Sequence, residues 1–421
     1  MIKRVIVICL LIMIAILANG CWDRRELESL GLVQALGLDL GPDQKGVTVT
    51  TMIAIPSMLG GEQGGGAGDK PGVFLVSMDA PSIYEAFNLI NTTVNREITL
   101  IQNRLLIIGE ELARHGVERW IDNLIRYREM RRTLLIFVCK GKAAEILRVQ
   151  PRLENKPSEY VNALAALSRR TGMYPTVTLN DFLKYYEAFA QENYLPLLDN
   201  YRRKEGSEAE PAKNQAQLGG GESGSGAGGP SQEKGPQKQD DVRFIGSAIF
   251  KKDRMVGIFD LYETQILLLL NDEFKEAMLT IEDPLKKGNY VVFKLLATAP
   301  VKIQYQRQKK VDRFKVQLKL EADLLSIQSQ IDYTQPKLEK FLSRVIAVEL
   351  KNRVEKVIEK AQQEYNSDVF GFGEKVRSTF ITSPKYENYH WPDKFKDARI
   401  SVEVKVDLRR VGVQFQPPES R

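Results

Sequence analysis

One segment near the middle of the chain cannot contribute to a folded core. Residues 204–241 are rich in Gly, Pro, Ser, Gln and charged side chains and contain no aromatic residue. A segment of this composition has too little apolar surface to offset the entropy lost on ordering. The 421-residue chain is therefore expected to fold as two regions, residues 21–203 and 242–416, joined by a flexible linker.

Charge and cysteine content exclude several classes of protein. The 60 Lys and Arg against 54 Asp and Glu give a net charge of only +6, and we expect no nucleic-acid partner. Cys9, Cys21 and Cys139 share no C-x-x-C spacing, and the chain has only two His. We therefore expect no disulfide framework, no metal site and no cofactor.

The N-terminus indicates export and lipid attachment. Lys3 and Arg4 precede an apolar run of fourteen residues, Val5–Ala18, which as a helix spans about 21 Å and falls short of the ~30 Å hydrocarbon core. Residues 1–20 are thus predicted to be a signal peptide. The following Cys21 completes a sequence, LANGC, that resembles a bacterial lipobox, and we predict that it carries S-diacylglycerol and an N-acyl chain.

Two points about this site stay open. Ala18 stands where a lipobox has Leu, and Asn19 follows it, which leaves the efficiency of cleavage undetermined. The alternative for Cys21 itself is a buried thiol.

The residues after Cys21 are expected to lie at the membrane surface. Trp22, Arg24 and Arg25 lead almost directly into an apolar segment, without the polar tether found in many lipoproteins. An indole suits the bilayer interface, and each Arg near anionic lipid contributes about 1 kcal/mol. A pair of Arg side chains bridged to Asp23 and Glu26 in solvent is the alternative.

The first region alternates strand and helix patterns. Residues 47–55 carry an apolar side chain or Thr at every second position, and residues 105–109 and 134–138 are short apolar runs. Between them, Ser82 and Glu85 form a capping box before a helix, and residues 117–125 have one apolar face. This order predicts a mixed α/β domain. Two amphipathic segments, residues 158–168 and 179–193, are expected to form a helical subdomain.

The second region begins with a predicted β-hairpin and helix, residues 242–288. In residues 289–416 we predict strands at 290–297, 302–307, 314–324 and 400–408, the last two with clean alternation of apolar and polar residues. The longest helix pattern, residues 337–365, lies between them. The fold class is therefore α+β, multi-domain, with mixed sheets and flanking helices, and with a C-terminal antiparallel sheet packed on one long helix. We expect the apolar stripe of that helix to be core; a surface for a partner helix is the alternative.

The residue types needed for catalysis are scarce. The chain contains no G-x-x-x-x-G-K-[ST], H-E-x-x-H or G-x-S-x-G motif. Cys139 follows a predicted core strand and is expected to be a buried thiol. His115 is expected at a helix terminus, and His390 lies in an aromatic cluster, Tyr389–Pro392. We predict that the protein is not an enzyme and has no catalytic or metal-binding residues.

Three stretches together resemble one family. They are GCWDRREL at Gly20–Leu27 with the strand Leu36–Asp39, the hairpin Gly246–Gly257, and NSDVFGFG at Asn366–Gly373 followed by Trp391 and the strand 402–412. In this order they are similar to the Ger(x)C family, the C-subunit lipoproteins of spore germination. The resemblance extends along nearly the whole chain after Cys21.

The resemblance implies a function. Ger(x)C proteins are non-enzymatic subunits of nutrient germinant receptors in the inner membrane of bacterial spores, on its extracytoplasmic face, where they assemble with integral membrane A and B subunits. Of the functional residues of the family, only the lipidated cysteine is assigned to this chain by the resemblance, at Cys21. The two Phe of Asn366–Gly373 suggest a contact with those subunits; burial of Phe370 and Phe372 against the long helix is the alternative.

The two alternative functions are a solute-binding lipoprotein and a wall-active hydrolase. A solute-binding lipoprotein of a transporter would have two similar lobes around a cleft. A wall-active hydrolase would need a carboxylate or metal site.

Overall fold

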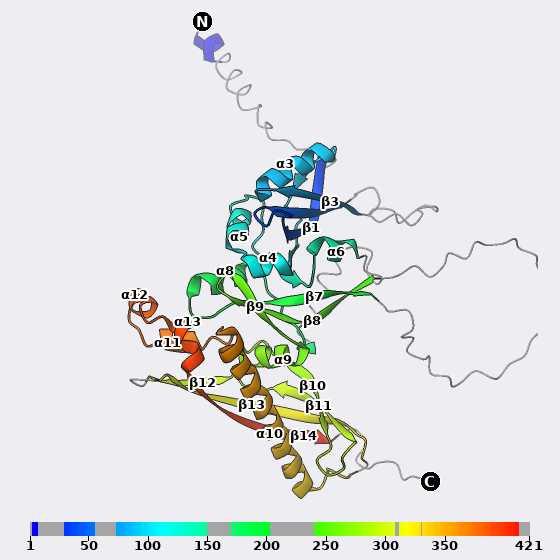
Figure 1. Cartoon of the computed structure of the whole chain (residues 1–421), viewed down its shortest axis with the longest axis vertical. Helices are drawn as coiled ribbons and strands as arrows, with labels where there is room; N and C mark the ends of the chain where they lie inside the picture. Colours follow the sequence, from blue (N-terminus) through cyan, green and yellow to red (C-terminus); the bar gives the residue numbers. More distant parts are fainter. Residues whose placement is uncertain are drawn as a thin grey trace, which may run out of the picture.

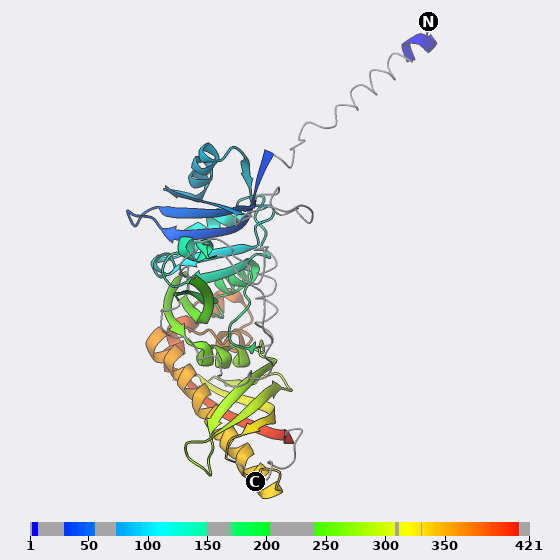
Figure 2. The ribbon, with the colours of Figure 1, turned by 90° about the vertical axis from the view of Figure 1, so that its right-hand side faces the viewer.

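The computed structural model of the chain describes residues 2–6, 29–54, 73–149, 168, 171–202, 240–307, 311–329 and 331–411. These residues form an elongated body in which two β-sheets follow one another along the long axis, as two perpendicular views show (Figures 1 and 2). The described fold starts at one end of this body, and the C-terminal sheet with its long helix forms the other end. The predicted helix at 158–168 and most of residues 204–241 lie outside the described residues.

The first sheet has nine strands in the order β3-β2-β1-β5-β6-β7-β8-β9, with β4 beside β1. Strands β1, β4, β5, β6 and β7 run parallel to one another. The flanking strands β2, β3, β8 and β9 each pair antiparallel with their neighbours. The predicted strands at 47–55, 105–109 and 134–138 are confirmed. The bounds are β1 Leu30–Leu40, β2 Val47–Ala54, β3 Val73–Ala80, β4 Glu97–Thr99, β5 Leu105–Gly109, β6 Leu135–Cys139, β7 Tyr194–Arg202, β8 Asp240–Lys251 and β9 Arg254–Phe259.

Helices cover both faces of this sheet because its central strands are apolar on both sides. On one face pack α3 (Ile83–Thr93), α4 (Glu110–His115), α5 (Glu118–Ile125) and α8 (Leu179–Ala188), and on the other packs α6 (Ala143–Arg148). The predicted cap is present, since Ser82 Oγ accepts a hydrogen bond from the Glu85 amide at 3.2 Å. The helix predicted at 179–193 ends at Ala188, and β7 begins six residues later.

The predicted hairpin forms, but it joins the sheet of the first region and is not part of a separate subdomain of the second region. Strands β8 and β9 pair with each other and β8 pairs with β7, so the hairpin completes the first sheet. We had grouped it with the C-terminal region because residues 204–241 precede it. The strand that receives it, β7, contains Pro196, which obscured the strand pattern in the sequence.

The second sheet has five strands, β10 (Glu276–Glu282), β11 (Tyr290–Ala297), β12 (Lys302–Gln306), β13 (Arg313–Ile327) and β14 (Arg399–Val411). Strands β10 to β13 are antiparallel, whereas β14 pairs with β13 in parallel. The predicted alternation in β13 is confirmed, since the even-numbered residues from Phe314 to Leu324 are buried. A parallel β14 requires a long crossover, which the long helix supplies.

That helix, α10 (Pro336–Lys360), continues into a π-helical turn, Ala361–Tyr365. The apolar stripe predicted for this helix is core, as expected, with Leu342, Leu350, Val354 and Ile358 buried; Ile346, which the predicted stripe did not include, is buried beside them. Glu349 and Arg353 form an ion pair at 2.7 Å. Phe341 has the spacing of this stripe and was expected to be buried with it, but its side chain is 38% exposed.

The two sheets share a core because one short helix packs between them. Helix α9 (Leu261–Leu270) follows β9 and is buried at every position from Thr264 to Leu270. It lies between the two sheets (Figure 1) and contacts both β8 and α10. A helix with no polar face has to be covered on all sides, and here the first sheet covers one side and α10 the other.

Candidate functional site

The segment Asn366–Gly373, which we had singled out from the sequence, joins the two halves of the molecule. It follows the π-helical turn and lies against the first sheet. The amide of Glu192 donates to the Asp368 carbonyl at 2.9 Å, and the Ser367 hydroxyl donates to the carbonyl of Phe250 in β8 at 2.5 Å. The side-chain amides of Gln191 and Asn271 both donate to the Val369 carbonyl. The segment is thus a structural joint.

The two Phe of this segment are buried, so our suggestion that they contact a partner is wrong. Phe370 is 3% exposed and Phe372 is fully buried. Phe370 stacks on Phe259, and Phe372 packs on Phe314 and Phe395. The alternative, that they close the core at the end of the long helix, is confirmed.

A buried carboxyl organises this joint. Asp368 accepts hydrogen bonds from the Phe372 amide at 3.1 Å, the Gly373 amide at 2.7 Å and the Trp391 indole at 2.8 Å. Burial raises the pKa of Asp368 to about 7 although these donors act in the opposite direction. All three donors belong to the protein and the site is closed. The group therefore holds α11 (Phe372–Arg377) and α13 (Trp391–Lys394) to the joint.

A second buried carboxyl lies at the C-terminal ends of the parallel strands, where α/β proteins commonly bind ligands. Asp39, at the end of β1, accepts hydrogen bonds from the amides of Ala143 at 2.7 Å and Ala144 at 3.1 Å. These are the first amides of α6. Burial raises the pKa of Asp39 against these donors. The helix therefore occupies this position, and the carboxyl caps it.

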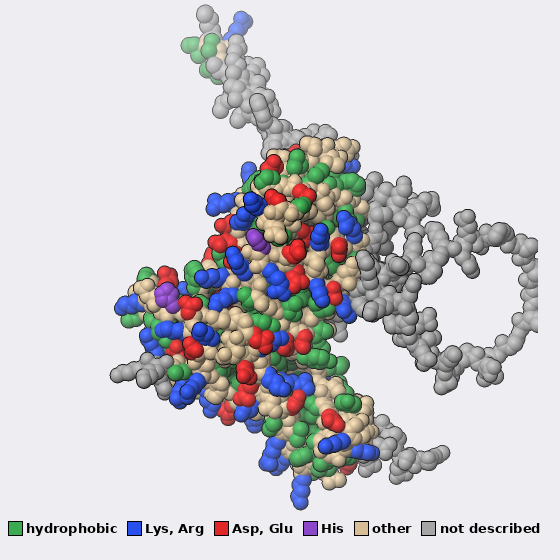
Figure 3. All heavy atoms as spheres, in the orientation of Figure 1, with side chains coloured by type: hydrophobic (Ala, Val, Ile, Leu, Met, Phe, Trp, Pro, Cys, Tyr) green, Lys and Arg blue, Asp and Glu red, His purple; other side chains and the backbone are tan. Residues whose placement is uncertain are grey.

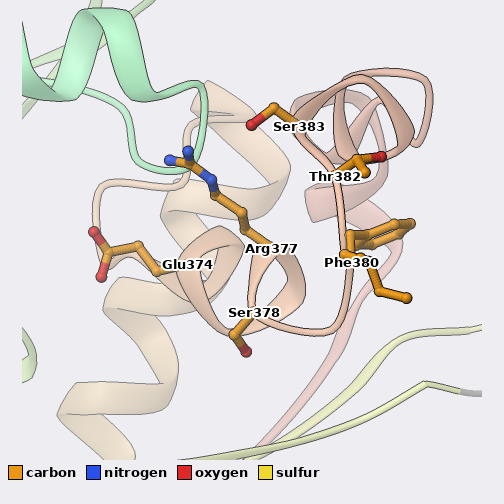
Figure 4. Close-up of a pocket in the computed structure, with 7 residues that line it drawn as sticks. Glu374, Arg377, Ser378, Phe380, Thr382 and Ser383 are labelled. Carbon is orange, nitrogen blue, oxygen red and sulfur yellow. The ribbon is translucent and has the colours of Figure 1, made fainter.

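The cavity in Figure 4 lies beside the joint, on α11 and the turn before α12 (Ser383–Glu387). It has a volume of about 350 Å³ and is partly open to solvent. Arg377 is its one basic residue and Glu374 its one acidic residue, and Figure 4 shows both head groups on the side of the site away from Phe380. The lining residues are Glu374, Arg377, Ser378, Phe380, Ile381, Thr382 and Ser383.

The predicted site residues at the N-terminus, Cys21, Trp22, Arg24 and Arg25, lie outside the described residues. Cys139 is in β6 and fully buried, as predicted. Burial, with the carboxylate of Asp39 nearby, raises the pKa of its thiol well above the usual range, so it stays protonated and unreactive.

The two His are exposed and lie on different elements. His115 was expected on the surface or as a cap just before the helix at 117–125; it is exposed, but it is the last residue of a separate helix, α4, and His390 precedes α13. Within the described ranges, no three His, Cys, Asp or Glu side chains lie close enough to hold a metal ion. None of the helices in those ranges is long and apolar enough to cross a bilayer.

Comparison with known proteins gives one consistent family. Residues 23–200 match the model of the spore germination protein N-terminal domain, and residues 245–412 match the "spore germination B3/GerAC like, C-terminal" model. The putative spore germination protein YfkR of Bacillus subtilis is 26% identical over 98% of this chain and 99% of its own. Spore germination protein KC of the same organism is 31% identical over 48% of this chain and 49% of its own.

The fold has a counterpart among solved structures. The crystal structure of the GerBC protein superposes with a TM-score of 0.52 at 16% identity, covering 92% of this chain and 99% of that one. At this identity the likeness concerns the fold, which is the mixed α+β architecture predicted from the sequence. Because the two family models match both halves in the order of the chain, this protein belongs to the Ger(x)C family of spore germination proteins.

Proposed function

We propose that this protein is the non-catalytic, lipid-anchored C subunit of a nutrient germinant receptor. Cys21 carries the acyl chains, and the folded part lies on the extracytoplasmic face of the spore inner membrane. There it assembles with the integral membrane A and B subunits and contributes to triggering germination. The observation that carries this proposal is the match of both halves of the chain to spore germination families.

A non-catalytic role is supported by what the buried polar groups do. Asp368 holds two short helices to the joint, Asp39 caps α6, and Cys139 is a protonated thiol inside a strand. The pKa values of these three groups are raised by burial, and each group already has a structural role. Perturbed groups in an active site face an open cleft instead.

The short chain segment between Cys21 and the first strand is compatible with an anchor at Cys21 that holds the fold at the membrane surface. Ser29, the residue before β1, is the eighth residue after Cys21, and a segment of this length reaches at most about 28 Å. The start of the first sheet would therefore stay close to the headgroups.

A solute-binding lipoprotein is the alternative function, and the fold gives it no support. That function calls for two similar lobes, whereas the two sheets here differ in strand number, strand order and helix cover.

Copurification tests the proposal. The tagged chain is solubilised in mild detergent from spore membranes and isolated, and its partners are identified by mass spectrometry. We expect both A and B subunits in amounts comparable to the bait. A tagged spore lipoprotein of another family serves as the control and should recover neither. Recovery of the chain without A and B subunits, from spores that contain both, would overturn the assignment.

A further inference from the structure

Strands β1, β4, β5 and β6 run parallel, so their first residues lie along one side of the first sheet, at the strand ends. We call this line of strand starts the edge, and the described chain enters the fold there. Strand β1 begins at Leu30, beside Glu97 at the start of β4. Strand β5 begins opposite Ala35, and β6 begins beside β5 at Leu135. All four strands run in the same direction from this edge.

Two loops at this edge carry exposed arginines. The first, residues 100–104, leads into β5, and the second, residues 126–134, leads into β6. The loops lie side by side, since the Leu135 amide donates to the Arg104 carbonyl at 2.9 Å. Their exposed arginines are Arg104, Arg126, Arg128, Arg131 and Arg132, and Ile101 beside them is 42% exposed. We refer to these five arginines and Ile101 as the arginine edge.

The arginine edge is held in place by the residues between the arginines. Tyr127 packs on Tyr84 and Phe87 of α3, with ring centroids 5.4 and 5.6 Å apart. Glu129, the one acidic residue of the second loop, accepts hydrogen bonds from Thr99 Oγ1 at 2.6 Å and the Leu100 amide at 3.0 Å. The arginine side chains between these anchors project outward.

The positive charge of these arginines is available to a partner. Among the described residues, none of the five guanidinium groups takes part in an ion pair. The exposed acidic residues on the adjoining elements α3, β4 and α5 are Glu85, Glu97, Glu118 and Asp122. Figure 3 shows that Lys and Arg side chains alternate with Asp and Glu side chains over the upper part of the molecule on the face in view.

We propose that the arginine edge rests on the anionic lipid headgroups of the membrane. This inference rests on the proposed anchoring at Cys21, because the eight-residue connection to Ser29 keeps this edge near the bilayer. Guanidinium groups bind phosphate in a bidentate geometry, and Ile101 can enter the interface between them. The lipid and the arginine edge then fix the orientation of the molecule. The strands of the first sheet lie across the long axis of the body, so the arginine edge faces one side of the part that holds this sheet, and the second sheet with α10 lies farther along that axis (Figures 1 and 2).

Vesicle binding without any acyl chain tests this. The complete chain from residue 21 onward, with Cys21→Ser, is mixed with vesicles of phosphatidylcholine alone or with 30 mol% phosphatidylglycerol, and the bound fraction is measured by flotation. We expect binding to the anionic vesicles only, and Arg128→Ala with Arg131→Ala to weaken it roughly 25-fold, about fivefold for each arginine.

The matched control removes two equally exposed charges at the far end of the molecule, Lys337→Ala with Lys340→Ala at the start of α10. We expect it to bind as the parent does, and thermal melting verifies that both double variants are folded. Equal weakening by the two double variants, or equal binding to both kinds of vesicle, would overturn the arginine edge as a lipid contact.

The result of the vesicle experiment does not depend on whether Cys21 is lipidated in cells. If Cys21 carries no lipid in cells, the vesicle result is unchanged, because the tested chain has none. If the anionic vesicles do not bind the chain while Cys21 still retains the protein in membranes, the arginine edge is rejected and the anchor stands.

Discussion

The indole Nε1 of Trp391 donates a hydrogen bond to Oδ2 of Asp368 at 2.8 Å, inside a core that excludes water from both residues. The same oxygen accepts from the Gly373 amide. Gly373 is needed there because a Cβ would overlap the Ala190 carbonyl and the Trp391 ring. The resemblance that identified the family included all three residues, and the structure places them in one contact that joins the two halves.

The buried Asp368 makes the stability of the fold depend on pH. Its pKa is about 7 in the fold and 3.8 in the unfolded chain. The native state thus holds a proton that the unfolded state releases. The stabilisation is complete below about pH 4 and is lost as the pH rises through 7, by up to about 1.4 kcal/mol per pH unit. Urea unfolding of wild type and Asp368→Asn at pH 5 and pH 7 measures it. We expect the free energy of unfolding to fall more steeply with pH in the wild type than in Asp368→Asn. An equal fall in the two proteins would contradict a raised pKa of Asp368.

The contact between Gly257 and Tyr365 ties β9 to the end of α10. A Cβ at position 257 would overlap the ring of Tyr365, whose hydroxyl donates to the Ile258 carbonyl at 2.9 Å. We expect Gly257→Ala to destabilise the protein by about 2 kcal/mol through overpacking. In a Tyr365→Ala background the same change should cost much less, since the ring is gone. A double-mutant cycle from denaturant unfolding gives this coupling, and additive effects would show that the overlap is relieved in another way.

The cap formed by Asp39 should contribute to the stability of the first sheet. Asp39→Ala leaves two buried amides of α6 without acceptors, and we expect a loss of about 2–4 kcal/mol. Asp39→Asn keeps one acceptor and should lose about half as much. Asp122→Ala, at an exposed position on α5, is the control and should be within about 0.5 kcal/mol of wild type. If Asp39→Ala behaves like that control, the carboxyl does not support α6.

The thiols report the state of Cys21. After removal of residues 1–20 the chain has two Cys, and Cys139 is buried with a raised pKa. We expect a thiol reagent to find no reactive thiol in the native protein and one after unfolding, because Cys21 is modified. Two thiols after unfolding and none before would indicate the alternative, a buried Cys21. One reactive thiol in the native protein would indicate a free, exposed Cys21.

Much of the fold could be predicted from the sequence because its elements carry strong local patterns. The alternation in β13 and the stripe of α10 each specify one buried face, and both are where we placed them. The cap at Ser82 is local too. These features depend on residues a few positions apart.

Features set by contacts between distant residues were missed. Strand β7 contains Pro196 and follows a helix, so its strand pattern is weak. The assignment of β8 and β9 to the first sheet depends on pairing with β7 across residues 203–239. The parallel direction of β14 follows from the crossover through α10.

The same holds for the site. Asn366–Gly373 is distinctive in sequence, but two Phe between Gly residues suit a surface or a core equally well. The arginine edge was missed although residues 126–132 hold four Arg against one Glu, because the sequence alone does not show that this loop and Arg104 lie at the same end of the sheet. Only the parallel pairing of β5 and β6 brings Arg104 beside the end of the loop that carries the other four arginines.

The most direct test of the account is the Cys21→Ala variant in sporulating cells. Membrane fractions are compared with wild type for the amount of this protein, and the spores are tested for germination with nutrients and with a nutrient-independent trigger. We predict that the variant leaves the membrane, that nutrient germination fails and that nutrient-independent germination persists. A variant that remains in the membrane and supports nutrient germination would contradict lipid anchoring at Cys21 as the basis of function.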